Sequence, residues 1–132
     1  MKYFTIEELL RSDTASSRGI DNVPTFYALQ NLEALVANVL DPLREAYGKP
    51  IYVNSGYRSP ALNRAVGGSK TSQHVSGQAA DITTRTREGN RELWDLVLKL
   101  NLPFDQMIDE QGWRWLHISY NPTGGRRQHW HG

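Results

Sequence analysis

The stretch SQHVSGQAADIT, residues 72–83, changes character halfway along. Its first part is small and polar and is typical of a loop, whereas Ala79 to Thr83 has the short apolar run of a strand. The loop carries His74 and the strand carries Asp81. We therefore expect the junction between loop and strand to direct an imidazole and a carboxylate toward one point.

The segments on either side of this stretch predict helices first and short strands later. Apolar residues recur every three or four positions in the helical segments and alternate in the strands. Because the order lacks a βαβ rhythm, the sequence predicts an α+β domain with a small, mainly antiparallel sheet packed with helices. The expected elements are a capped helix from Thr5 to near Arg11, a helix over 25–47 kinked or restarted at Pro42, a strand over 51–54, a helix over 60–66, a loop over 67–77, the strand 79–83, a helix around Leu93–Leu100, and a hairpin of 106–109 with 114–120 about Gln111-Gly112.

Length and composition favour a single soluble domain spanning residues 1–132, which we expect to be monomeric. The formal net charge is +1, so the basic excess of a nucleic-acid binder is missing. The N-terminal residues show no signal peptide, and no apolar run is long enough to span a membrane. The expectation is cytoplasmic synthesis, with any target in the cell wall reached after release or delivery.

A third candidate ligand lies near the end of the chain, in Trp115-Leu116-His117-Ile118-Ser119. Strand alternation places His117 on the more polar face. The chain has no cysteine, so a metal would be held by His, Asp or Glu, and two imidazoles with one carboxylate leave the open position of a catalytic zinc site. A structural hydrogen bond of His74 is the alternative on spacing alone.

The segment from Ser72 to Asp81 matches the pattern Ser-x-His-x-x-Gly-x-Ala-x-Asp. With the arginine-bearing turn at 55–59 and the segments 104–106 and 115–119, it resembles the zinc D-Ala-D-Ala carboxypeptidase and hedgehog-like metallopeptidases. That group includes vancomycin-resistance dipeptidases and several phage endolysins. The resemblance covers about residues 3 to 127.

The resemblance implies zinc held by His74, Asp81 and His117, and hydrolysis of cell-wall peptides that contain D-amino acids. Arg58 would then act at the catalytic site and bind the substrate carbonyl or terminal carboxylate through its forked donors. Ser72 is similar to a family serine near the substrate, and a loop-shaping hydroxyl is the alternative. A D-Ala-D-Ala carboxypeptidase and an L-Ala-D-Glu-type endopeptidase both remain open.

The general base is the position where the pattern departs from the family. Many relatives carry an acidic residue three positions before the last His, where this chain has Arg114. We expect Glu110 to be the base, although a tight Gln111-Gly112 turn would set it opposite Trp113, about 13 Å along the strand from His117. A bulge or bent turn would shorten that distance, and under another register Asp105 or Asp109 would be the base.

Two further alternatives follow from the same residues. Arg114 at the usual base position favours a zinc-binding, non-catalytic peptidoglycan or virion-associated module, and the small size is compatible with a component of a phage particle or secretion device. In the C-terminal tail, His129 and His131 suggest a second metal site, whereas a frayed terminus is the ordinary expectation.

Overall fold

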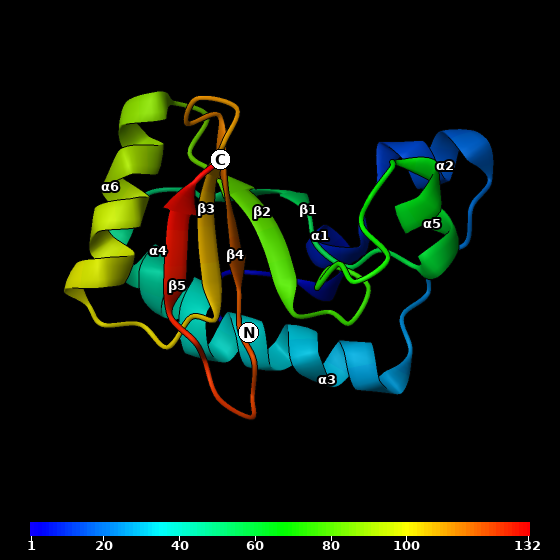
Figure 1. The fold of residues 1–132 in the computed structure, drawn as a ribbon, viewed down its shortest axis with the longest axis horizontal. Coiled ribbons are helices and arrows are strands. Elements are labelled where there is room, and N and C mark those ends of the chain that lie inside the picture. The colour runs from blue at the N-terminus through cyan, green and yellow to red at the C-terminus, as the bar shows by residue number, and fades with distance from the viewer.

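The computed structural model describes all of residues 1–132, and Figure 1 shows helices arranged around a single sheet. Helices α3 and α4 cross behind one face of the sheet, and α6 flanks it on the side of β5 (Figure 1). In chain order the elements are α1 (Ile6–Leu10), α2 (Asp13–Arg18), α3 (Phe26–Leu35), α4 (Asp41–Tyr47), β1 (Tyr52–Ser55), α5 (Pro60–Ala65), β2 (Ala79–Thr83), α6 (Arg87–Lys99), β3 (Gln106–Glu110), β4 (Trp115–Ser119) and β5 (Gln128–His131).

Helix starts follow the side-chain caps in the sequence. Thr5 and Glu8 form the predicted capping box at α1, in which each side chain bonds to the other residue's backbone N–H. Helix α2 was not predicted from the sequence, although Ser12 caps it by accepting a hydrogen bond from the Ala15 N–H and Gly19 ends it in the left-handed region. The short polar run between these residues hid the helix because it has no apolar periodicity.

The long helical segment over residues 25–47 is confirmed, with an interruption at its centre. Between α3 and α4 the backbone winds as a π-helix over Val36–Leu40. Of the two effects predicted for Pro42, the restart is absent, because Leu40 and Asp41 before it both keep right-handed helical backbone angles. The π-helical residues directly precede α4, and Gly48 ends the segment with a φ of 74°.

The sheet has the strand order β1-β2-β4-β3-β5 and confirms the predicted α+β class. The pairs β1–β2, β2–β4 and β3–β4 are antiparallel, while β5 lies parallel to β3 at the edge. The frayed terminus expected for the tail is therefore wrong. Residues 128–131 form a strand because their partner, β3, is distant in sequence and cannot be recognised from the tail alone.

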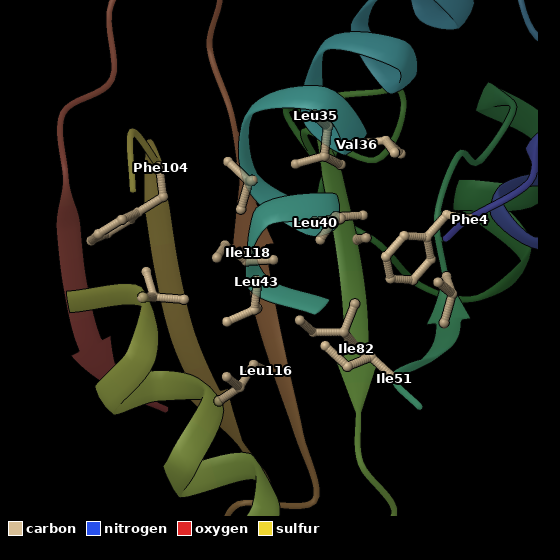
Figure 2. Close-up of a cluster of buried hydrophobic side chains, with 14 of the residues drawn as sticks. Phe4, Leu35, Val36, Leu40, Leu43, Ile51, Ile82, Phe104, Leu116 and Ile118 are labelled. Atoms are coloured by element: carbon tan, nitrogen blue, oxygen red, sulfur yellow. The ribbon is translucent and has the colours of Figure 1, made fainter. Parts of the chain in front are cut away.

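One face of the sheet forms the hydrophobic core with the helices. Figure 2 shows Leu35, Leu40 and Leu43 of the helical segment directed at strands that carry Ile82, Leu116 and Ile118. All six of these side chains are at most 1% exposed. Alternation along β2 and β4 then turns Asp81 and His117 to the opposite face. None of the helices combines the length and apolar character that crossing a membrane would require.

The hairpin between β3 and β4 has a longer loop than the sequence suggested. Glu110 pairs with Trp115, and Ile108 pairs with His117. The loop therefore contains the four residues 111–114, closed by a bond from the Arg114 N–H to the Glu110 carbonyl. The predicted register, with Glu110 opposite Trp113, is wrong by two residues because Gln111 and Trp113 both adopt positive φ, at 47° and 68°.

Replacing Gly77 by Ala should destabilise the protein more than the same change at Gly67. Both glycines have a φ near +75°, which costs an L-residue about 1 to 2 kcal/mol. At Gly77 an added Cβ would also lie 2.2 Å from the backbone oxygen of Ala28, whereas at Gly67 it would meet nothing within 4 Å. Urea denaturation of the two variants measures the difference, and equal losses would contradict the close approach of this loop to α3.

Candidate metal centre

Three predicted ligands converge on the open face of the sheet. Asp81 lies at the middle of β2, and His117 is its directly paired neighbour on β4. His74 comes from the loop that precedes β2. The two strand residues share a face because paired antiparallel positions point to the same side, so the ladder itself brings the carboxylate and one imidazole together.

The distances between the candidate ligand atoms fit a small cation. Asp81 Oδ1 lies 3.3 Å from His74 Nε2 and 3.2 Å from His117 Nδ1. The three ligand atoms all lie within 4.8 Å of one another. Tetrahedral zinc bonds of about 2.0 to 2.2 Å place neighbouring ligand atoms about 3.3 to 3.6 Å apart. The donor set and its spacing therefore fit zinc.

The His74 ring is held so that one nitrogen is directed into the site. Its Nδ1 lies 2.7 Å from the Gly56 carbonyl oxygen, which only accepts hydrogen bonds. Nδ1 therefore carries the proton, which leaves Nε2, the nitrogen that faces the site, available to bind a metal. The ring is buried, and the loop backbone is also anchored by the bond from the Arg58 N–H to the His74 carbonyl.

The Asp81 carboxylate is nearly buried and ionised. Burial opposes its charge, but the nearby imidazoles of His117 and His74 outweigh that cost and hold its pKa well below the ordinary value. Its second oxygen, Oδ2, lies 3.6 Å from Nη2 of Arg58. The site therefore contains a fixed anion that lies beside two imidazoles and a guanidinium.

Arg58 and Ser72 both line the groove in which the three candidate ligands lie. The Arg58 guanidinium is fixed by Nε donating to Ser55 Oγ at 3.2 Å and Nη1 donating to Asn63 Oδ1 at 3.3 Å. The Ser72 hydroxyl accepts a hydrogen bond from the His74 backbone N–H at 3.2 Å. Ser72 thus has the loop-shaping contact that was one of its two predicted roles, and its contact with a substrate stays a prediction.

Glu110 enters the same groove from the end of β3. Since it pairs with Trp115, two residues before His117, its side chain lies on the same face as His117. Desolvation by burial raises its pKa; His117 opposes that shift, while Asp81 and Asp109 add to it. Because the loop has four residues and not two, Glu110 lies opposite a residue two positions from His117, and not four positions as the tight turn predicted.

The other acidic candidates lie elsewhere. Asp105 is fully buried and bound by Arg126, and Asp109 is directed away from the groove and bonds to His131. His131 and His129 instead lie against the ring of Trp94. Neither histidine belongs to a group of three potential metal ligands, so the tail offers no second site of that kind. No pattern in the sequence signalled these pairings, because their partners are distant along the chain.

The groove is open, polar and about 570 Å³ in volume. The loop 66–74 forms one wall, and Gln106, Ile108 and Trp115 on the sheet form another. Among the aromatic residues nearby, Trp115 lines the groove, whereas Tyr57 is buried in the core and Trp113 packs on Trp94.

Comparison with known proteins agrees with this site. The family model for peptidase M15 matches residues 2–119. A zinc D-Ala-D-Ala carboxypeptidase of Streptomyces albus G is 42% identical over 81 residues, which are 60% of this chain and 30% of that protein. The chain thus spans less than a third of the length of this relative. On the extent of the family match, the chain belongs to the peptidase M15 family.

Proposed function

We propose that this protein is a zinc-dependent metallopeptidase that hydrolyses peptide bonds in bacterial cell-wall peptides containing D-amino acids. The observation that carries the proposal is the juxtaposition of two imidazoles, an ionised carboxylate and a separate glutamate in one open groove. Family membership and the zinc D-Ala-D-Ala carboxypeptidase of Streptomyces albus G support the same substrate class.

His74 Nε2, Asp81 Oδ1 and His117 Nδ1 are the atoms that would hold zinc. When bound, zinc polarises a substrate carbonyl and lowers the pKa of a coordinated water toward neutrality. The chain prepares the site beforehand, because Gly56 fixes the protonated nitrogen of His74 and the β2–β4 pairing fixes Asp81 against His117.

Glu110 is the general base in this proposal. Its carboxylate accepts a proton from the attacking water and then delivers it to the departing amine, so that no free ion has to leave the groove. A pKa raised by burial suits this exchange, since it makes the carboxylate a stronger base. Arg114, at the position where many relatives carry the base, cannot accept a proton.

Arg58 and Ser72 orient the substrate. The guanidinium carries a permanent charge, and its contacts with Ser55 and Asn63 fix its orientation before a ligand arrives. It can donate to the scissile carbonyl or to a terminal carboxylate. Ser72 offers a hydroxyl on the same wall of the groove. The roles of these two residues differ for the two candidate bonds, because only a carboxypeptidase needs to bind a free C-terminus.

The test uses purified protein loaded with zinc and two muropeptides, one ending in D-Ala-D-Ala and one with that end amidated. Release of D-Ala from the free end alone identifies a carboxypeptidase, and internal cleavage of both identifies an L-Ala-D-Glu-type endopeptidase. Binding of zinc and muropeptide without cleavage of either substrate would overturn the enzyme proposal in favour of a non-catalytic peptidoglycan or virion-associated module. Neighbouring genes for holins or tail proteins would support delivery by a phage.

A further inference from the structure

Asp105 is a buried carboxylate that the proposed mechanism does not use. It lies at the start of β3 and has no exposed surface. Arg126 contributes three donors to it: the backbone N–H and Nε bond to Oδ1 at 3.0 and 2.9 Å, and Nη2 bonds to Oδ2 at 2.8 Å. The Arg126 side-chain bonds are the main reason that the pKa of Asp105 is lowered to about 2.

The remaining donor to Asp105 comes from the metal-site loop. Nε2 of Gln73, the residue before His74, donates to Asp105 Oδ2 at 2.8 Å. The other end of the same amide, Oε1, is buried and has no hydrogen-bond partner. Asp105 is therefore the sole polar anchor of the Gln73 side chain, and a buried amide that lost this bond would have no compensation.

The Gln73 backbone is hydrogen-bonded within the loop that contains His74. Its carbonyl accepts hydrogen bonds from the Gln78 N–H at 2.9 Å and from Ser76 Oγ at 3.1 Å. These bonds close the turn that contains His74. A side chain fixed at Asp105 thus holds one end of the turn, while the bond between His74 and Gly56 holds the ring itself.

Arg126 lies in the segment that follows the family match, which ends at residue 119. This segment returns along β3, and Figure 1 shows it as the loop that leads into β5 beside that strand. The segment therefore supplies the cation that compensates the buried charge of Asp105, and the connection from Arg126 through Asp105 to Gln73 spans 53 residues of chain.

We propose that Asp105 is a positioning residue for the metal centre: held by Arg126, it fixes Gln73 and thereby the loop that presents His74. This proposal rests on the proposed function for its catalytic consequence, but not for its structural one. Without the Arg126 side chain, a buried carboxylate loses two of its four donors and must recruit water or reorient. Either response weakens the bond to Gln73 and widens the range of positions open to His74.

Two variants test the connection at different points. Gln73→Met keeps the length of the side chain and the Asp105–Arg126 pair but removes the donor, and Arg126→Ala removes the side-chain cation. Arg127→Ala is the matched control, because its guanidinium lies over the Phe104 ring and not on Asp105. Hydrogen exchange of the Val75, Gly77 and Gln78 amides is measured on metal-free protein, and the zinc dissociation constant by chelator competition.

In both test variants these amides should exchange about tenfold faster than in wild type. Zinc should bind about 10- to 100-fold more weakly, which is the usual effect of removing an outer partner of a metal ligand. Arg127→Ala should change neither the exchange rates nor the zinc affinity. The double variant should show little further weakening, since both changes break one chain of contacts. Unchanged exchange or zinc affinity in Gln73→Met would overturn the proposal. If wild type binds zinc but cleaves no peptide, the proposed function fails, and hydrogen exchange and zinc affinity still decide the role of Asp105. If wild type binds no zinc, hydrogen exchange of the loop amides alone decides that role.

Discussion

Glu110→Gln should bind zinc as wild type does and lose hydrolysis of cell-wall peptides by a factor of about 10² to 10⁴. The substitution keeps the shape of the side chain and its place in the groove beside Asp81 and His117. A neutral amide has no site that accepts a proton at working pH, so the attacking water keeps its proton and the departing amine receives none. The measurement is kcat/KM on the muropeptide that wild type cleaves, with zinc content determined on the same samples.

Glu92→Gln is the control for this experiment. Glu92 lies exposed on α6, outside the groove, and carries the same charge change. We expect its kcat/KM to stay within twofold of wild type. A Glu110→Gln variant that kept more than a tenth of the wild-type rate would remove Glu110 from the mechanism and require a base from outside the residues that line the groove.

His74→Ala should abolish the stabilisation that zinc gives to the folded protein. A ligand that binds only the folded state stabilises it by RT ln(1 + [L]/Kd), or about 4 kcal/mol at a free zinc concentration 1,000 times Kd. Without His74, one imidazole and one carboxylate remain, too few to hold zinc in a catalytic arrangement. Thermal unfolding with and without added zinc measures the difference, and peptide hydrolysis should fall to background.

Comparing metal-free proteins separates this effect from packing. His74 is 3% exposed, so its removal also leaves a cavity that lowers stability without zinc. The informative quantity is therefore the change in unfolding temperature that added zinc causes within each protein. His129→Ala, in β5, should keep the full shift. An equal zinc-dependent shift in His74→Ala and wild type would contradict a metal centre at this position.

Local signals in the sequence predicted the strands that carry two of the three candidate ligands. The strand over 79–83 was found with its bounds, because the loop before it is polar and the strand itself is apolar. Alternation in 115–119 correctly placed His117 and Leu116 on opposite faces of the strand, because successive side chains of a strand point to opposite sides of the sheet. The loop before β2 predicted that His74 and Asp81 converge, whereas the assignment of zinc to His74, Asp81 and His117 came from the resemblance to a family.

Features that depend on distant partners could not be predicted in the same way. The hairpin loop was misread because Gln111-Gly112 is a good two-residue turn by itself, while the structure places Trp113 at positive φ and packs its ring on Trp94. That aromatic contact offsets an unfavourable backbone conformation, and nothing near Trp113 in the sequence signals it. The same limit applies to the tail and to Arg126, whose partners β3 and Asp105 lie about twenty residues away.

The two outer strands of the sheet have a consequence for behaviour at high concentration. Unpaired strand edges are templates for association between copies of a chain. Here one edge is β1, with four residues and an irregular register between Val53 and Ser55, and the other is β5, also with four residues. Neither offers a long, flat row of free backbone groups, so β2 and β4, which carry Asp81 and His117 and lie inside the sheet, are shielded from intermolecular β-pairing.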